Sequence, residues 1–389
     1  MTEWKETTLG DICLKITDGA HHSPKEFEGG KPMFSVKNMR DQGFDYNGVK
    51  TISEEDFVKL VNSGCQPKSD DILIAKDGSV MKHVFRVKGN VDYVLLSSIA
   101  IVRPDIAKVN PSYLVYAIKD PSTTDLILNN FVGGSGVPRI VLKDFKKVDL
   151  TIPDIQTQKA IAETLSSLDD KIDLLHRQNK TLEQMAETLF RQWFLEEEVN
   201  LKPLGECIQT TSGGTPSRKN MDYYENGTVQ WIKSKELNRG YLLDTEEKIT
   251  EDAINNSSAK ILPKNSVLIA MYGATVGEYA IIGQQATCNQ AICACIPNKD
   301  FPYTYIYYTI KANEEELINM AVGSAQQNIS QVLIKGLDIP VDETKIKLFH
   351  EEVDPMMKKI KLNYKHMNNL KNMRDTLLPK LMSGEVTVN

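Results

Sequence analysis

The chain of 389 residues is long enough for two or three domains that each bury a core of their own. Its hydrophobic share of 41% and charged share of 25% are typical of a globular protein and argue against a disordered chain. The formal net charge of −6 excludes a uniformly basic nucleic-acid binder but leaves room for a local basic groove.

No signal-peptide pattern opens the sequence and no apolar run reaches the roughly eighteen residues of a membrane span, so we expect a cytoplasmic protein without membrane contact. The six cysteines match neither a paired CxxC zinc site nor a small disulfide framework. We therefore expect free thiols in the core and no bound metal.

The first region, residues 1–154, alternates short apolar runs with glycine-containing turns. The runs at 71–75, 93–102 and 147–152 predict strands, and the apolar spacing over 111–130 predicts a helix. This region is therefore expected to be a mixed α and β domain.

A long helix is predicted for residues 155–198, because apolar side chains recur at alternating steps of four and three, which is typical of a coiled coil. Asn179 interrupts this seam. A polar residue at such a position favours one register of pairing, although it is also often merely tolerated. The predicted core positions are Ile161, Leu165, Leu168, Ile172, Leu175, Asn179, Leu182 and Leu189.

Residues 199–341 repeat the texture of the first region. Apolar runs at 267–271, 279–282 and 291–296 predict strands, and residues 303–319 predict a helix. A second mixed domain is therefore expected here.

A second seam occupies residues 342–389. Asp354 and Pro355 are an N-cap type followed by the residue favoured at the first helical position, so we expect the long helix to begin there after a short helix from 343. Roughly 27 residues at about 1.5 Å each give about 40 Å per helix, close to one turn of DNA. The predicted core positions are Val353, Met356, Ile360, Met367, Leu370, Leu377 and Leu381.

Shifting the chain on itself by about 195 residues reveals an internal repeat. Leu9-Gly10-Asp11 falls on Leu204-Gly205-Glu206, and ILIAKDG from Ile72 falls on VLIAMYG from Val267. The fold class expected is α+β, with two homologous mixed α/β domains separated by two long helices packed as an antiparallel coiled coil, in a pseudo-two-fold internal repeat. The expected boundaries are 1–154, 155–198, 199–341 and 342–389.

Four segments carry a family resemblance: IPDIQTQKAIAETLSSLDDKI (152–172), GGTPSRKNMDYYENGTVQWIKSKEL (213–237), GSAQQNIS (323–330) and LLPKLMSGEV (377–386). In this order they are similar to the specificity subunit of type I restriction-modification systems. The first domain departs most from the pattern, since it has Asp18-Gly19-Ala20 where the second has Gly213-Gly214-Thr215.

The resemblance implies a non-catalytic subunit that reads a bipartite target in double-stranded DNA, with one half-site per target-recognition domain. The helices would act as a spacer and dock two modification (methyltransferase) subunits, and restriction (translocase/nuclease) subunits would join them. S-adenosylmethionine, ATP and Mg²⁺ would belong to those partner subunits, with no cofactor in this chain.

Two other functions, an enzyme and a scaffold, are the alternatives to DNA recognition. An enzyme is disfavoured, because the glycine-rich FVGGSG is followed by Pro138 rather than a helix, and no GxxxxGK[ST] occurs. A coiled-coil scaffold that binds only protein partners remains the alternative, although two diverged domains beside matched helices argue against it.

Reading of DNA needs side chains that bond to base edges and basic groups that bond to phosphates. The candidates in the first domain are His21, His22, Lys37, Asn38, Arg40, Lys76, Lys82 and Arg139. Those in the second domain are Arg218, Lys219, Lys233, Ser234, Lys235, Gln326, Gln327 and Asn328. Turn or capping roles for the amides, and a solvated face for the lysines, are the alternatives.

Overall fold

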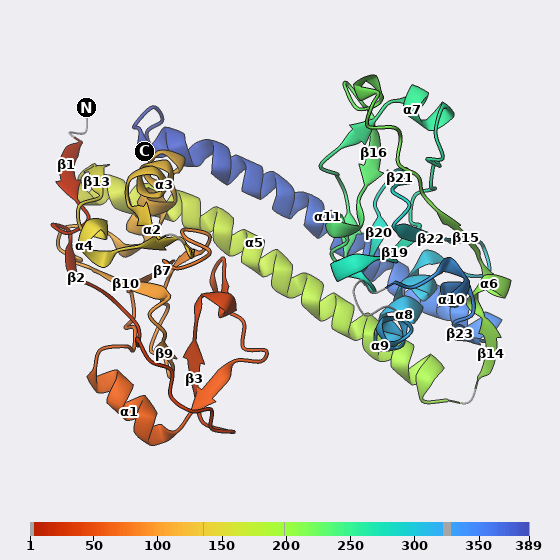
Figure 1. The fold of residues 1–389 in the computed structure, drawn as a ribbon, viewed down its shortest axis with the longest axis horizontal. Coiled ribbons are helices and arrows are strands. Elements are labelled where there is room, and N and C mark those ends of the chain that lie inside the picture. Colours follow the sequence, from red (N-terminus) through yellow and green to blue (C-terminus); the bar gives the residue numbers. More distant parts are fainter. Residues whose placement is uncertain (1–3, 135, 198, 322–327, 389) are drawn as a thin grey trace. The chain divides into compact units, whose positions relative to one another are not determined.

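A computed structural model describes residues 4–134, 136–197, 199–321 and 328–388 (Figure 1). The chain forms two compact units, the first made of Met1–Lys171 with Leu370–Asn389 and the second of Ile172–Asn369. The boundary falls inside both long helices, so each unit holds one part of each helix.

The first unit is built on a four-stranded antiparallel sheet whose two faces are both covered. Ile72 and Ile74 pack on one face and Leu73 and Ala75 on the other, in separate apolar clusters. Because both faces are buried, the strand reads as a continuous apolar run rather than an alternating one. In sheet order the strands are β2 (Cys13–Asp18), β10 (Ile99–Pro104), β7 (Ile72–Ala75) and β8 (Val84–Arg86).

Three helices and a smaller sheet also belong to this unit. The predicted helix over 111–130 is broken in two, because Pro121 disfavours the helical conformation of the preceding Asp120. The predicted strand over 93–102 is likewise two strands. These elements are α1 (Glu54–Asn62), α2 (Pro111–Lys119), α3 (Pro121–Asn130) and the sheet β6 (Lys50–Ile52), β3 (Lys31–Phe34), β9 (Val94–Leu95).

The remaining short elements of the first unit are β4 (Met39–Arg40), β5 (Gly43–Phe44), β11 (Val132–Gly133), β12 (Arg139–Ile140), α4 (Leu142–Phe145) and the 3₁₀ turn Val36–Asn38. Strand β1 (Lys5–Thr8) pairs antiparallel with β13 (Asp149–Ile152). This pair closes the segment that precedes the first long helix.

The second unit has a five-stranded sheet, and here too alternate residues enter different clusters. Val267 and Ile269 face one cluster, and Leu268 and Ala270 face the other. In sheet order the strands are β15 (Gln209–Ser212), β22 (Ile292–Ile296), β19 (Val267–Ala270), β20 (Tyr279–Ile282) and β17 (Tyr241–Leu242). The predicted strands at 267–271, 279–282 and 291–296 are confirmed as β19, β20 and β22.

The rest of the second unit is made of β18 (Lys248–Ile249), β16 (Val229–Ile232), β21 (Thr287–Cys288), α6 (Leu204–Cys207), α7 (Glu251–Asn255), α8 (Tyr303–Ala312), α9 (Glu314–Asn319), α10 (Gln331–Lys335) and the 3₁₀ turns Met221–Tyr223, Ser234–Glu236 and Gly273–Thr275. Strand β14 (Asn200–Pro203) pairs antiparallel with β23 (Asp338–Val341).

The predicted internal repeat is confirmed by the strand topology. In the first unit β3 pairs antiparallel with β6 and parallel with β9. In the second unit β16 pairs antiparallel with β18 and parallel with β21. The pairs β1–β13 and β14–β23 match in the same way, so each unit carries the same arrangement of strands.

The long helices are α5 (Ile155–Phe190), which continues into a π turn at Arg191–Leu195, and α11 (Glu343–Met382). Asp154 caps the start of α5 by accepting from the backbone N–H of Thr157 at 3.1 Å, and Asp342 caps α11 by accepting from that of Lys345 at 3.0 Å. The expected helix start at Asp354-Pro355 is wrong. Pro355 is exposed, so water can satisfy the carbonyl that loses its helical donor there.

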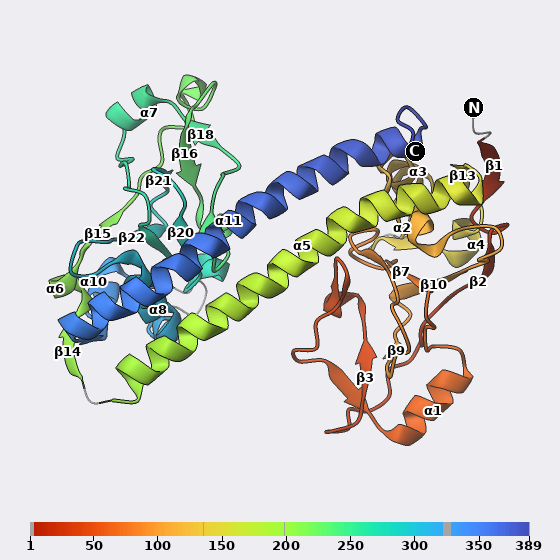
Figure 2. The same cartoon turned by 180° about the vertical axis from the view of Figure 1, so that it is seen from behind.

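Within each unit the two helices pack antiparallel, as predicted. In the first unit Arg374 of α11 bonds to Asp169 of α5 at 2.7 Å. In the second unit, through which the ribbons of α5 and α11 both run (Figure 2), the Asn363 amide donates to Asn179 Oδ1 at 2.7 Å. The two asparagines therefore face each other across the seam, where their bond favours one register.

The seam positions predicted from the sequence are all buried or half-buried. The buried ones are Ile161, Leu165, Ile172, Leu175, Asn179, Val353, Ile360, Met367 and Leu381. The half-buried ones are Leu168, Leu182, Leu189, Met356, Leu370 and Leu377. Next to Met356 and Leu377, the neighbouring Met357 and Leu378 are more deeply buried, because they pack into the clusters of the two units.

All six cysteines are free thiols. Over the residues that the structure describes, every helix is too short or too polar to cross a membrane.

Candidate nucleic-acid interface

In the first unit, the residues Ser97 and Ser98 hold three loops together. The N–H of Ser97 donates to the Ala20 carbonyl at 2.9 Å, and Ser98 Oγ accepts from the Val36 N–H at 3.1 Å. The Ser98 carbonyl accepts from the Lys76 N–H at 3.0 Å. We call the place where these loops meet the first corner, and it consists of Ala20, Val36, Lys76, Ser97 and Ser98. The loops that meet there carry candidate DNA-binding residues of this unit.

The loop after β2 passes very close to the backbone of this corner. A Cβ at Gly19 would lie 2.1 Å from the Leu95 carbonyl oxygen, so only glycine fits at this position. His21 and His22 follow on this loop and are exposed. Glycine at 19 therefore holds the histidine segment against the corner.

Lys76 does not offer a free charge. Its side chain is only 9% exposed, and its ammonium lies 3.3 Å from Asp18 and 3.2 Å from Asp77. His21 lies 3.2 Å from the same Asp18. The first corner thus contains a buried ion-pair group that fixes two loops together, and Lys76 is expected to position them rather than to contact phosphate.

The turn after β3 divides its candidates between local and solvent-facing roles. The Asn38 side chain accepts from the Ser35 N–H at 3.1 Å, which is a capping role. Arg40 bonds to Asp45 at 2.7 Å and to the Lys37 carbonyl at 3.0 Å. The Lys37 side chain is exposed, as is that of Lys82 in the turn between β7 and β8.

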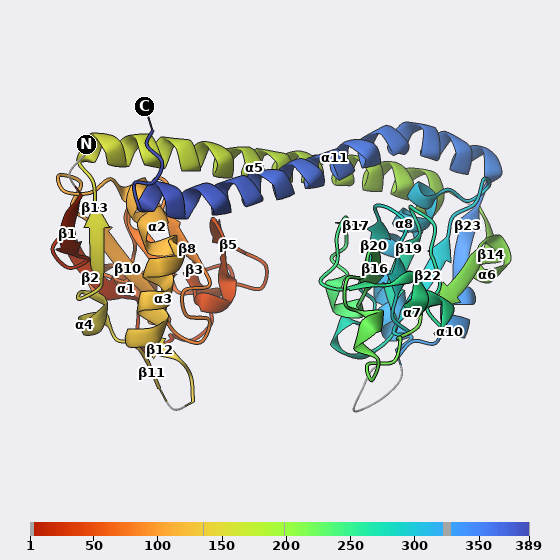
Figure 3. The same ribbon diagram turned by 90° about the horizontal axis from the view of Figure 1, so that it is seen from above.

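Arg139 lies on β12, which borders the first corner. The Ile140 N–H donates to the Lys76 carbonyl at 3.0 Å, and the Gly78 N–H donates to the Pro138 carbonyl at 2.8 Å. The Arg139 side chain is exposed. Figure 3 shows β11 and β12 at the end of the first unit that lies farthest from α5 and α11.

In the second unit, Gln290 and Ala291 take the place of the two serines, because the Ala291 carbonyl accepts from the Met271 N–H as the Ser98 carbonyl does from the Lys76 N–H. Asn289 takes the place of Leu96, whose N–H donates to the Phe34 carbonyl at 2.8 Å. The Asn289 N–H donates to the Ile232 carbonyl at 2.9 Å, and the Met271 N–H donates to the Ala291 carbonyl at 2.8 Å. The Thr215 hydroxyl donates to the Gln290 side-chain oxygen. We call Thr215, Ile232, Met271, Asn289 and Gln290 the second corner.

The glycine pair before Thr215 is required by close packing. A Cβ at Gly213 would lie 1.9 Å from the Cys288 carbonyl oxygen, and one at Gly214 would lie 2.3 Å from Ser258 Oγ. Gly213 thus lets this loop pack against β21, as Gly19 does against Leu95 in the first unit, and Gly214 lets it pack against Ser258.

The cations near the second corner are already paired with two carboxylates. Lys233 lies 2.8 Å from Glu246 and 3.0 Å from Glu247, and Lys235 lies 2.7 Å from Glu246. Arg218 bonds to Glu247 at 2.6 Å. These two carboxylates are not among the residues predicted from the sequence, because no short motif connects them to the cations.

Arg218 is also held by aromatic rings. Its guanidinium lies 4.0 Å from the centroid of Tyr224 and 5.2 Å from that of Trp231. Stacking of this kind fixes the plane of the side chain. Lys219 is exposed, and Ser234 is half-buried at the start of a 3₁₀ turn.

Asn328 pairs with the end of β19. It forms an antiparallel bridge with Tyr272, and the following Ile329 N–H donates to the Met271 carbonyl at 2.9 Å. Its side chain is exposed. The candidates Gln326 and Gln327 lie outside the described residues.

Hydrogen bonds from Lys233 and Lys235 lower the pKa of Glu246 from 4.5 to about 2. A carboxylate whose pKa is lower in the folded state stabilises the fold above its ordinary pKa, and this contribution is lost as the pH falls through the folded value. The stability difference between wild type and Glu246→Gln should therefore be constant above about pH 4.5.

Below that pH the difference should shrink toward zero as the pH approaches about 2. The measurement is denaturant unfolding between pH 7 and pH 3. In a background with both Lys233 and Lys235 changed to methionine, Glu246→Gln should have little effect at any pH. A difference that stays unchanged on acidification would contradict the ion pairing.

Within the described ranges, no group of three or more His, Cys, Asp or Glu side chains could hold a metal ion.

A family model and the related proteins described below all indicate one protein family. The family model described as "Type I restriction modification DNA specificity domain" matches residues 1–184 and 196–346. The type I restriction enzyme MjaIX specificity subunit of Methanocaldococcus jannaschii is 26% identical over 441 residues, covering 100% of this chain and 97% of that protein. The HindI specificity subunit of Haemophilus influenzae is 23% identical over 472 residues, covering 99% and 100%.

Among solved structures, the S subunit of a type I restriction-modification system from M. genitalium matches with a TM-score of 0.63 at 16% identity. The match covers 98% of this chain and 96% of that one. The similarity therefore extends to the fold of essentially the whole chain.

Proposed function

Because the chain belongs to the family of type I restriction-modification DNA specificity proteins, we propose that it is the DNA specificity subunit of such a complex. It would bind a bipartite target in double-stranded DNA, with one half-site per unit. The observation that carries this proposal is the pair of corners, which share their backbone bonding and differ in their side chains.

The difference between the corners is a difference in chemistry. The first has Leu96, Ser97, Ser98 and Lys76 at the positions where the second has Asn289, Gln290, Ala291 and Met271. A common framework with different polar groups is what two unlike half-sites require, because base edges are read by hydrogen bonds from side chains. Loops held on a rigid sheet are a usual place for such recognition.

Contacts to phosphate are expected from the cations that have no carboxylate partner in the described structure. Lys37 and Lys82 in the first unit and Lys219 in the second are exposed and meet this condition. Arg218, Lys233 and Lys235 would first have to leave Glu246 and Glu247. Binding through these side chains should weaken with added salt, because each phosphate contact releases counterions.

The modification subunits would dock on α5 and α11. Both helices expose apolar side chains outside their mutual seam: Leu174 and Met185 on α5 are 48% and 49% exposed, and Leu362 and Met373 on α11 are 44% and 51% exposed. A partner that packs along the helices would cover these side chains and remove their apolar surface from water. The methyl donor S-adenosylmethionine, and the ATP and Mg²⁺ of restriction subunits, would be bound by those partners, and this chain would carry no catalysis.

The test is selection from random-sequence DNA by the chain copurified with its modification subunit. The retained fragments should share two short conserved blocks separated by an unconserved spacer of fixed length. Retention without any shared sequence would contradict the proposal and leave a coiled-coil scaffold that binds only protein as the function.

A further inference from the structure

One backbone position is equivalent in the two units. The carbonyl of Lys76 accepts from the Ile140 N–H at 3.0 Å, and the carbonyl of Met271 accepts from the Ile329 N–H at 2.9 Å. Lys76 and Met271 are aligned in the repeated ILIAKDG and VLIAMYG, and each directly follows a central strand. The residue before the donor is Arg139 in the first unit.

In the second unit the residue before the donor is Asn328. Its bridge to Tyr272 is antiparallel, and so is the bridge of Arg139 to Asp77. Asp77 and Tyr272 are themselves aligned in the repeat. Arg139 and Asn328 thus hold the same place in the backbone bridge of each unit, and each directly precedes an isoleucine.

Both side chains point away from the core. Ile140 and Ile329 are 1% and 0% exposed, so each is anchored in its unit. Neighbouring side chains of extended backbone point to opposite faces, which directs Arg139 and Asn328 outward. Both are exposed accordingly.

These two side chains also lack bonding partners among the residues that the structure describes. In the part of the chain that the structure describes, neither the Arg139 guanidinium nor the Asn328 amide has a hydrogen-bond or ion-pair partner, whereas Asn38 bonds to Ser35 and Arg218 to Glu247. A side chain whose donors are free can meet a base edge without first breaking a bond.

The chemistry of each side chain selects one purine. Arginine bonds to O6 and N7 of guanine with two parallel bonds, and asparagine bonds to N6 and N7 of adenine in the same way. We propose that Arg139 and Asn328 are equivalent specificity residues, with Arg139 reading a guanine in one half-site and Asn328 an adenine in the other. This inference rests on the proposed function.

The test uses the full chain with its modification subunit and maps the methylated motif for the variants Arg139→Asn and Asn328→Arg. In Arg139→Asn, one position of one half-site should change its preference from guanine to adenine by about 10-fold or more. Asn328→Arg should change one position of the other half-site from adenine to guanine.

Two further variants separate readout from charge. Lys143→Asn removes an exposed cation close in sequence to Arg139, and it should leave the motif unaltered. Arg139→Ala should relax one position without creating a new preference. Thermal unfolding of each variant should match wild type, because both positions are exposed.

The outcomes distinguish this inference from the function on which it rests. If folded Arg139→Asn and Asn328→Arg both keep the wild-type motif, or if either changes both half-sites, the inference is overturned and sequence-specific recognition still stands. If the wild-type complex shows no sequence preference at all, the proposed function is overturned instead.

Discussion

Replacing Phe349 with alanine is expected to lower the free energy of unfolding by about 3–5 kcal/mol, the range for removing a fully buried aromatic ring. Phe349 on α11 is 0% exposed. Its ring centroid lies 5.6 Å from that of Phe190, 5.7 Å from that of Phe194 and 5.8 Å from that of Tyr308. The ring therefore joins α11 to the end of α5 and to α8.

Leu348 is a matched control because it is the preceding residue on the same helix and is 48% exposed. Leu348→Ala should lower the free energy of unfolding by less than about 1 kcal/mol. The measurement is denaturant unfolding of the full chain, followed in the transition of the second unit, to which Phe349 belongs. Equal losses for the two variants would show that the aromatic cluster is not a main source of stability.

The framework of the molecule was predictable from the sequence because it depends on periodic patterns. The alternating steps of four and three located α5 and α11, and the apolar runs located β7, β19 and β20. The internal repeat then required both units to share one topology. Local breaks were predicted less well: the strand expected over 93–102 is interrupted between Leu95 and Ile99, where the first corner forms.

The candidate site was harder to predict, because side-chain partners come from loops far apart in the sequence. Lys76 lies in a turn-like AKDG segment that suggests an exposed side chain, yet Asp18 from another strand buries its charge. Lys233 and Lys235 likewise meet Glu246, which no periodic pattern connects to them. The equivalence of Arg139 and Asn328 is established by their shared backbone bonding.

The second prediction is that exchanging residues 199–341 for the same segment of another family member changes one half of the methylated motif and leaves the other half intact. The structure favours such an exchange because both ends of the segment lie in one pair of strands. Asn200 pairs with Val341 and Pro203 pairs with Asp338. A graft at these ends replaces a closed body and leaves both long helices unchanged.

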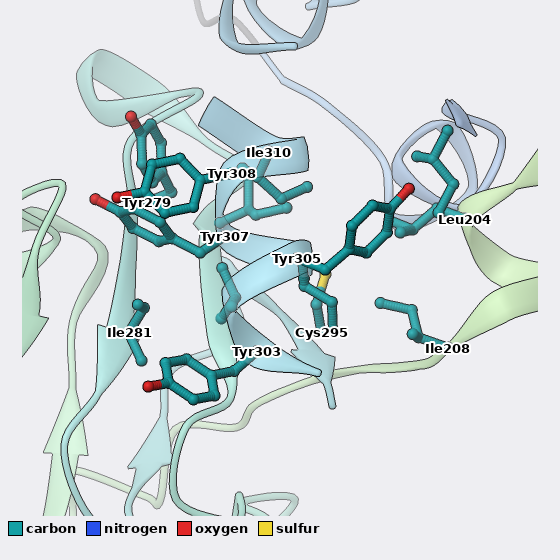
Figure 4. Packing of buried hydrophobic residues seen from close by; sticks show 14 of the residues in the cluster. Leu204, Ile208, Tyr279, Ile281, Cys295, Tyr303, Tyr305, Tyr307, Tyr308 and Ile310 are labelled. Atoms are coloured by element: carbon teal, nitrogen blue, oxygen red, sulfur yellow. The ribbon is translucent and has the colours of Figure 1, made fainter. Parts of the chain in front are cut away.

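The contacts between the exchanged segment and the helices decide whether the chimera folds. Tyr303 of α8 donates to Asp354 at 2.8 Å, and the hydroxyl of Tyr308 lies 3.7 Å from the sulfur of Met357. Figure 4 shows both tyrosines projecting from α8 into the buried cluster. Thr304 Oγ1 likewise lies 2.9 Å from Nδ1 of His350 on α11. A chimera that retains Tyr303, Thr304 and Tyr308 of this chain should therefore be more stable than one with an entirely foreign α8.

The measurement is the methylation motif of the chimera together with its modification subunit. The half-site read by the second unit should take the donor's sequence, and the spacer length should stay fixed, since α5 and α11 are retained. The reciprocal exchange of residues 1–154, whose ends lie in the pair β1–β13, is the matched control and should change only the other half. A framework that only positions loops should transmit no change from one half-site to the other. If either exchange alters both halves, the two units therefore do not read DNA independently.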